Sequence, residues 1–137
     1  MLSKIILVAL LLVSAAMADK LAVIATSGLI FKDKLEILSF EDPDIRGVVC
    51  YVTLPKRAMA FEDPTDTAIS CSRVSEISGE ISSRSHIFKQ SKDWFDKNMY
   101  VDRIYDKKHN VLIYVSYTKK ISGDKSANSG ISVIPIH

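Results

Sequence analysis

The chain has 137 residues, of which 47% are hydrophobic and 25% charged, with 18 basic and 16 acidic side chains. These values fit one globular domain, and they exclude a disordered chain, a collagen-like fibre and a two-domain enzyme with a cleft between its domains. The near balance of charge gives no sequence-wide attraction for nucleic acid or anionic lipid.

The N-terminus has the pattern of a secretory signal peptide. Lys4 precedes an unbroken apolar run over residues 5–13, and Ala16 and Ala18 are the small residues that signal peptidase reads before the bond it cuts. We expect residues 1–18 to be removed and residues 19–137 to form a single exported domain. No stable membrane span is expected after cleavage, because a spanning helix needs about 20 apolar residues.

Short apolar runs rich in β-branched residues predict strands along the mature chain. Residues 65–74 fit either a short helix or a strand, and residues 90–98 fit either one helical turn or a bulged strand. In chain order, the predicted strands are residues 21–26, 29–32, 34–40, 47–54, 85–92, 100–106, 111–119 and 130–136. This pattern predicts an all-β fold, mainly antiparallel, arranged as a sandwich or barrel with at most one or two short helices.

Three of these segments carry more specific information. Residues 47–54 and 111–119 are apolar on both faces, which indicates strands in the interior of a sheet. Residues 100–118 form a predicted hairpin, whose loop begins with Asp106 and ends with Asn110. Both residue types suit a short loop that contains a left-handed residue.

The two cysteines, Cys50 and Cys71, predict a disulfide, since an exported chain folds in an oxidising compartment. A redox-active pair is the alternative, but the cysteines lack the Cys-x-x-Cys spacing that lowers a thiol pKa. Zinc binding lacks a pair of histidines at ligand spacing.

The segment Phe-Glu-Asp-Pro occurs at residues 40–43 and again at residues 61–64, each followed at the same offset by a cysteine. The repeat is either the trace of a duplication or an accident of composition. Asp followed by Pro turns the chain in both copies. The carboxylates of these turns, with Asp66, are either ordinary Asx turns or a calcium site, although neither copy has the EF-hand spacing.

These segments together resemble the CreA family of exported bacterial proteins. The likeness extends over most of the mature chain, with departures at residues 56–60 and 75–76, where the family often has a glycine-rich segment and a Gly-Pro. The resemblance implies an exported, periplasmic, single-domain protein, and it names no biochemical activity. The matching blocks are residues 40–45, 47–52, 62–63, 66–71, 73–74, 87–89, 101–106, 110–117 and 128–135.

The hypothesis that we favour is a small binding module for an unidentified small ligand or an envelope protein, without a cofactor or nucleic acid. Arg103 either pairs with Asp42 or Asp63 inside the protein or binds an anionic ligand. The aromatic residues either line a ligand surface or pack the core; they are Trp94, Tyr100, Tyr105, Tyr114 and Tyr117. The candidate functional surface comprises Asp42, Asp63, Asp66, Arg103, Tyr105 and Tyr114.

An envelope hydrolase is the alternative. Two carboxylates among Asp42, Asp44, Asp63 and Asp66 could act as a glycosidase pair, or His86 or His109 could serve as the base for a serine. No catalytic motif distinguishes these residues from chance, so the binding module is preferred.

Overall fold

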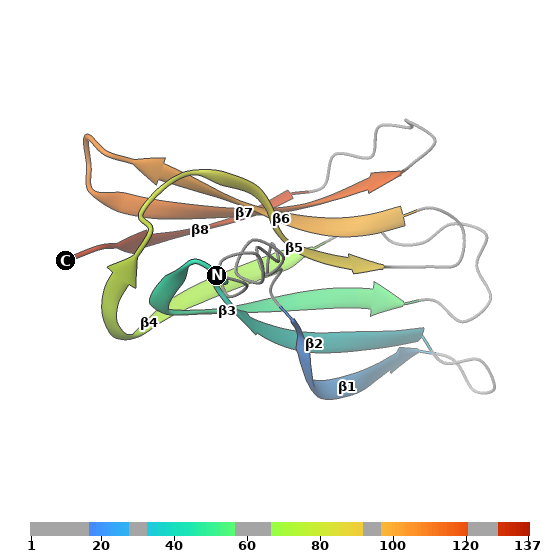
Figure 1. Cartoon of the computed structure of the whole chain (residues 1–137). Helices are drawn as coiled ribbons and strands as arrows, with labels where there is room; N and C mark the ends of the chain where they lie inside the picture. The colour runs from blue at the N-terminus through green and yellow to red at the C-terminus, as the bar shows by residue number, and fades with distance from the viewer. Residues whose placement is uncertain (1–16, 28–32, 57–66, 92–96, 121–128) are drawn as a thin grey trace, which may run out of the picture.

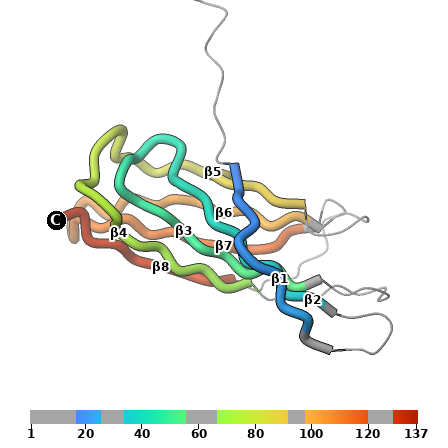
Figure 2. Tube along the Cα trace, turned by 90° about the horizontal axis from the view of Figure 1, so that it is seen from below, coloured from blue at the N-terminus to red at the C-terminus, as the bar shows by residue number. Residues whose placement is uncertain are grey.

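The computed structural model describes residues 17–27, 33–56, 67–91, 97–120 and 129–137, and every regular element in these ranges is a strand. Two four-stranded antiparallel sheets pack face to face as a sandwich (Figure 1), and Figure 2 shows the same strands from below. The first sheet contains β1 (Asp19–Ser27), β2 (Asp33–Glu41), β3 (Ile45–Lys56) and β4 (Ala68–Gly79), and the second contains β5 (Arg84–Ser91), β6 (Lys97–Asp106), β7 (Val111–Lys120) and β8 (Ser129–Pro135). The predicted all-β antiparallel fold is confirmed.

Within each sheet, every strand pairs with the next strand in the chain, so both sheets are simple meanders. As predicted, β3 and β7 are internal strands, and the hairpin joins β6 to β7 with Asn110 in the left-handed region at φ 56°. The ambiguous segment at residues 65–74 contains the start of strand β4. The strand predicted at residues 29–32, most of the ambiguous segment at 90–98 and Trp94 lie outside the described residues.

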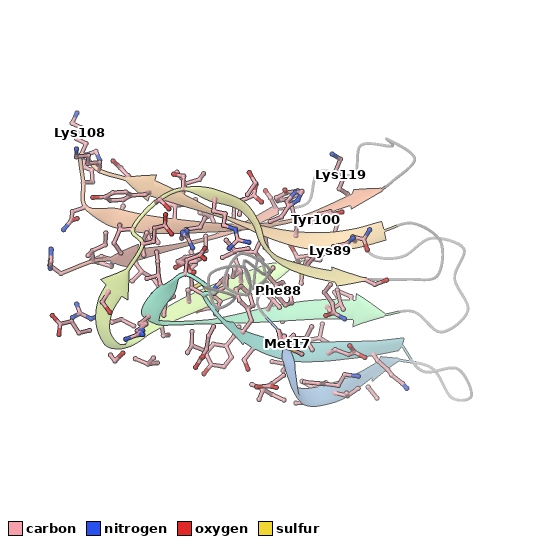
Figure 3. The ribbon with its side chains drawn as sticks, in the orientation of Figure 1. Met17, Phe88, Lys89, Tyr100, Lys108 and Lys119 are labelled. Carbon is pink, nitrogen blue, oxygen red and sulfur yellow. A yellow bond between two sulfur atoms is a disulfide. The ribbon has the colours of Figure 1, made fainter. Side chains whose placement is uncertain are left out.

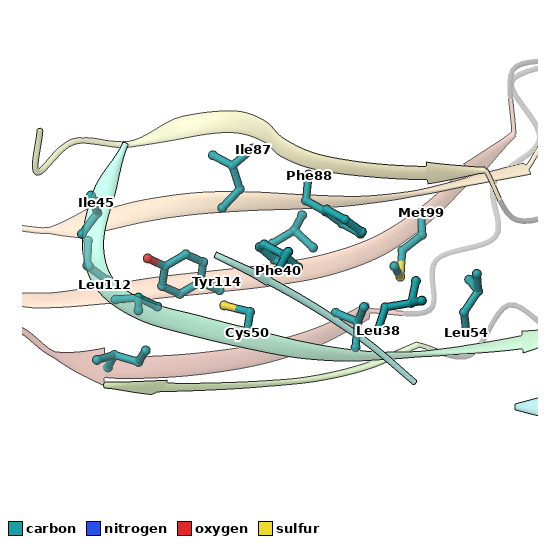
Figure 4. Close-up of a cluster of buried hydrophobic side chains, with 14 of the residues drawn as sticks. Leu38, Phe40, Ile45, Cys50, Leu54, Ile87, Phe88, Met99, Leu112 and Tyr114 are labelled. Carbon is teal, nitrogen blue, oxygen red and sulfur yellow. The ribbon is translucent and has the colours of Figure 1, made fainter. Parts of the chain in front are cut away.

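Side chains alternate between the core and the outside along each internal strand. On β3, Val48, Cys50 and Val52 are buried, whereas Tyr51 between them is exposed. The inward-facing apolar side chains of the two sheets form one continuous cluster (Figure 4). Phe40 and Phe88, one from each sheet, stack with their ring centroids 4.3 Å apart. Burial of this shared apolar layer is what holds the two sheets together.

Two glycines allow the end of β4 to approach the start of β3. Gly47 and Gly79 have positive φ values of 92° and 116°. A Cβ atom on Gly79 would lie 2.4 Å from the carbonyl oxygen of Asp44, and one on Gly47 would lie 2.6 Å from that of Glu76. Both positions therefore require glycine for conformation and for space.

The predicted disulfide joins neighbouring strands of the first sheet. Cys50 on β3 lies directly opposite Cys71 on β4, and their sulfur atoms are bonded. The Cys71 backbone N–H donates a hydrogen bond of 2.9 Å to Oγ of Ser132 on β8. The disulfide therefore lies where β4, an edge strand of the first sheet, meets β8, an edge strand of the second. It bonds β4 to the internal strand β3.

Reduction of this disulfide should lower the free energy of unfolding by about 3 kcal/mol, because it releases a loop of 21 residues in the unfolded chain. Urea unfolding with and without reductant measures the difference. The Cys50→Ala/Cys71→Ala variant, unfolded without reductant, is the matched control and should resemble the reduced protein. A loss below about 1 kcal/mol would contradict the stabilising role.

Candidate binding surface

Three residues of the sequence-predicted surface meet in the interior. Arg103 Nη1 donates to Asp42 Oδ1 at 2.6 Å, and the Tyr114 hydroxyl donates to Asp42 Oδ2 at 2.7 Å. The side chains of Arg103 and Asp42 are 1% and 0% exposed. Of the two partners considered for Arg103, the structure pairs it with Asp42.

Asp42 also holds the turn between β2 and β3. Its Oδ1 accepts the backbone N–H groups of Asp44 and Ile45, at 2.9 and 3.1 Å. These two bonds form the Asx turn that an Asp-Pro sequence predicts. Burial and the hydrogen bond to Asp42 raise the pKa of Tyr114, so its phenol remains a donor at neutral pH.

Arg103 extends the network to the connection between the sheets. Its Nε donates to the Ser82 carbonyl at 2.7 Å, and its Nη1 also lies 3.2 Å from Asp44 Oδ2. Arg84 donates to both carboxylate oxygens of Asp44, at 3.0 and 2.8 Å. Burial by itself raises the pKa of Asp44, but the hydrogen bonds and charges of Arg84 and Arg103 outweigh it and hold that pKa below its usual range.

This arrangement satisfies Asp42 completely. One oxygen accepts three N–H groups, the other accepts a phenol, and Arg103 supplies the compensating charge. The groups bind one another and face away from solvent, so the network joins the β2–β3 turn, the connection at residues 80–83 and the second sheet.

The other predicted site residues lie elsewhere. Tyr105 is partly buried against the core, and its backbone N–H donates to Oγ of Ser83. Asp63 and Asp66 are outside the described residues. The aromatic group is divided, because Tyr114 is buried whereas Tyr100 and Tyr117 lie on the outer side of the second sheet.

The Asp42→Asn substitution should lower the free energy of unfolding by about 3–5 kcal/mol, because it removes the buried carboxylate nearest to Arg103 and leaves its charge only the more distant, partly exposed Asp44. Asp44→Asn is the matched control: the Asp44 side chain is 21% exposed, so its loss should cost clearly less. Urea denaturation of both variants at neutral pH measures the difference. Equal losses would show that burial of Asp42 adds nothing to the pair.

The outer side of the second sheet presents an aliphatic face, which comprises Ile104, Ile113, Val115, Ile131 and Val133. Ile104, Ile113 and Val133 lie opposite one another on β6, β7 and β8, and Val115 lies opposite Ile131 in the adjacent row. Ile104, Ile131 and Val133 are 45%, 65% and 52% exposed. A set of exposed apolar side chains that is contiguous across three strands is typical of an interaction surface.

A cluster of aromatic and polar side chains borders the aliphatic face on β5, β6 and β7. The rings of His86 and Tyr100 stack at 4.2 Å, and Tyr117 lies 5.7 Å from Tyr100. The Tyr117 hydroxyl donates to both oxygens of Asp102, at 3.1 and 3.2 Å, and lies 3.0 Å from His86 Nε2. Since its one proton goes to Asp102, His86 Nε2 donates to the phenol oxygen. We call these four residues the His86 cluster.

Local backbone geometry and charge maintain this cluster. His86 has a positive φ of 55°, uncommon for a residue with a side chain, and its N–H donates to Asp102 Oδ1 at 2.8 Å. It lies in the register shift of β5 between Arg84 and Phe88. Burial and the hydrogen bond to Asp102 raise the pKa of Tyr117 to about 12, so the phenol stays protonated.

The aliphatic face was not identified from the sequence, although a signal for it is present. The signal is the second apolar side of residues 111–119, and Ile104, Ile131 and Val133 continue it on the neighbouring strands. An apolar residue on a strand does not by itself tell whether another layer covers it. That point depends on the tertiary structure: β6, β7 and β8 pair side by side, and no other layer among the described residues covers their outer side.

The histidines considered as catalytic bases contact other groups than serine. His86 bonds to Tyr117, and His109 Nδ1 lies 2.7 Å from Asp106 Oδ2 in the β6–β7 turn. Within the described ranges, no group of three or more His, Cys, Asp or Glu side chains is arranged to hold a metal ion. A search of the same residues finds no helix with the length and hydrophobicity of a membrane span.

Comparison with known proteins gives the family. The model of the family described as CreA protein matches residues 23–137. The chain belongs to the CreA family. Relatives described as Protein CreA, from Escherichia coli strain K12 and from the O6:H1 and O157:H7 strains, are each 33% identical to it over 75% of this chain and 73% of their own. The resemblance of the sequence blocks to the CreA family is thus confirmed, and no solved structure matches the chain.

Proposed function

We propose that this CreA-family chain is an exported, periplasmic interaction module that binds its partner through the aliphatic face. The observation that carries the proposal is the contiguity of exposed aliphatic side chains across β6, β7 and β8. Leaving such side chains in water is unfavourable, and covering them with a partner gains that free energy back.

The buried network supports binding over hydrolysis. A catalytic carboxylate must reach its substrate, and a general acid or base must exchange a proton with it. Asp42 is enclosed and neutralised by Arg103, and Asp44 is held by two arginines. These two carboxylates therefore suit the stabilisation of the fold, and the exposed aliphatic side chains provide the more direct functional hypothesis.

The position of β1 supports export with cleavage after Ala18. This strand begins at Asp19, so removal of residues 1–18 leaves both sheets intact. The Cys50–Cys71 disulfide is consistent with an oxidising compartment such as the periplasm.

Protein purified from the periplasm of the producing cell should have a mass that starts at Asp19. Cys50 and Cys71 should resist alkylation until a reductant is added, because the disulfide leaves no thiol. Intact mass spectrometry with and without reductant measures both properties. A retained residue 1, or cysteines alkylated without reduction, would contradict export as a disulfide-bonded domain.

A photoreactive amino acid placed at Val133 should form adducts in living cells, because this position lies within the proposed interface. Tyr51 is the matched control: it is 41% exposed on the outer side of the first sheet, and the same amino acid there should give few adducts. Gel mobility and mass spectrometry detect the products. Equal yields at the two positions would contradict the assignment of function to the aliphatic face.

A further inference from the structure

The charges of the two sheets differ in sign. The described part of the second sheet, residues 84–91, 97–120 and 129–137, contains eight Lys and Arg residues and two acidic residues, Asp102 and Asp106. The described part of the first sheet and its connections, residues 17–27, 33–56 and 67–83, contains five basic and eight acidic residues. Arg84 and Arg103 of the second sheet pair with Asp44 and Asp42 of the first. Without these two pairs the described second sheet has six basic and two acidic residues, and the described first sheet has five basic and six acidic residues. The excess of positive charge therefore lies in the second sheet, to which the aliphatic face belongs.

Lysines lie at both ends of the aliphatic face. Lys107 and Lys108 are exposed in the β6–β7 turn next to Ile104, and Lys119 is exposed near the other end of β7. Figure 3 shows Lys108 and Lys119 at opposite ends of the second sheet, with Lys89 near Tyr100. The ammonium group of Lys89 lies 5.9 Å from the centroid of the Tyr100 ring.

A further cation lies along the β8 side. Arg73 of β4 donates to the carbonyl oxygens of Ser75 and Ile136, and no carboxylate among the described residues pairs with it. It lines a shallow pocket between β4 and β8, together with Val133 and Pro135. Two acidic residues lie on the second sheet as well: Asp102, opposite Val115, accepts hydrogen bonds from the uncharged Tyr117 phenol, and Asp106 contacts His109. The four exposed lysines Lys89, Lys107, Lys108 and Lys119 outnumber these two carboxylates, so the net charge around the face is positive.

We infer that the aliphatic face docks onto an anionic phospholipid surface, and this inference rests on the function proposed above. Aliphatic side chains enter the boundary between headgroups and acyl chains, while lysines and an arginine around them reach phosphate groups. Tyr100 and Tyr117 lie at the border of the face, where tyrosine is favoured at a membrane interface. The first sheet, which has no excess of basic residues, then faces away from the lipid, so the charge asymmetry also orients the molecule.

The same charges disfavour a second copy of the chain as the occupant. Face-to-face packing of two second sheets would place lysines near lysines, because both ends of the face are basic. Packing of a second sheet on the first sheet of another copy would avoid this repulsion, but such a head-to-tail contact gives rings or open filaments and not a two-fold dimer.

The test is co-sedimentation of the mature protein with vesicles. One set contains phosphatidylcholine with about 30% phosphatidylglycerol, and the other contains phosphatidylcholine alone. We expect binding to the anionic set only, weakened at about 0.5 M salt because ions screen the lysines. Binding to neither set would overturn the inference, as would equal binding to both.

Variants locate the contact. Lys108→Glu/Lys119→Glu should weaken binding at least about tenfold through lost attraction, and Ile131→Ser/Val133→Ser should weaken it by a similar factor through lost apolar contact. Lys34→Glu and Val74→Ser, at exposed positions on the first sheet, are the matched controls and should bind like the unmodified chain. Equal loss in the controls would overturn the inference. Thermal unfolding verifies that every variant is folded.

Other occupants give distinct results. Protein adducts at Val133 without vesicle binding would identify a protein partner, and concentration-dependent light scattering without vesicle binding would identify a second copy. Either result would overturn the lipid inference and leave the proposed interaction function standing. Absence of adducts at Val133 together with absence of vesicle binding would overturn both.

Discussion

The buried pair of Arg103 and Asp42 is the interaction on which the arrangement of the two sheets depends. Arg103 belongs to β6 in the second sheet, and Asp42 belongs to the turn between β2 and β3 of the first sheet. The guanidinium of Arg103 also donates a hydrogen bond to the carbonyl oxygen of Ser82, which lies in the connection between the two sheets. Burying an arginine costs free energy unless its donors are paired. The turn, the connection and the second sheet must therefore adopt the positions that bring their acceptors to Arg103.

This internal use of charge has a consequence for the surface. The polar groups with the most specific geometry bind one another at one end of the sandwich, and the outer side of the second sheet retains aliphatic residues between lysines. The disulfide acts at a different place, where β4 and β8 approach. The ion pair, the disulfide and the apolar core thus stabilise the sandwich together, and the outer side of the second sheet keeps exposed aliphatic side chains, to which the proposed function assigns a partner.

Much of the fold follows from local sequence. The period of two on β3 and β7 predicts both their conformation and their interior position, and Asn110 ends the hairpin loop as its residue type predicts. The start of β4 was ambiguous because its short apolar pattern also fits a helix, and pairing with β3 decides it. On β5, Ile87 and Phe88 are adjacent and yet both buried, because a register shift redirects the strand. Simple alternation does not predict this.

For the candidate site, the sequence indicates Arg103 as an unusual charge on an apolar strand and supplies two Asp-Pro turns as possible partners. It also determines the cysteine pair and the family. Only the tertiary structure selects Asp42 for Arg103 and shows that the pair is enclosed, because these two residues are 61 positions apart in the chain. It likewise decides that the second apolar side of β7 remains uncovered in the described residues. Strand patterns record which side chains share a face, whereas exposure depends on which layers meet in space.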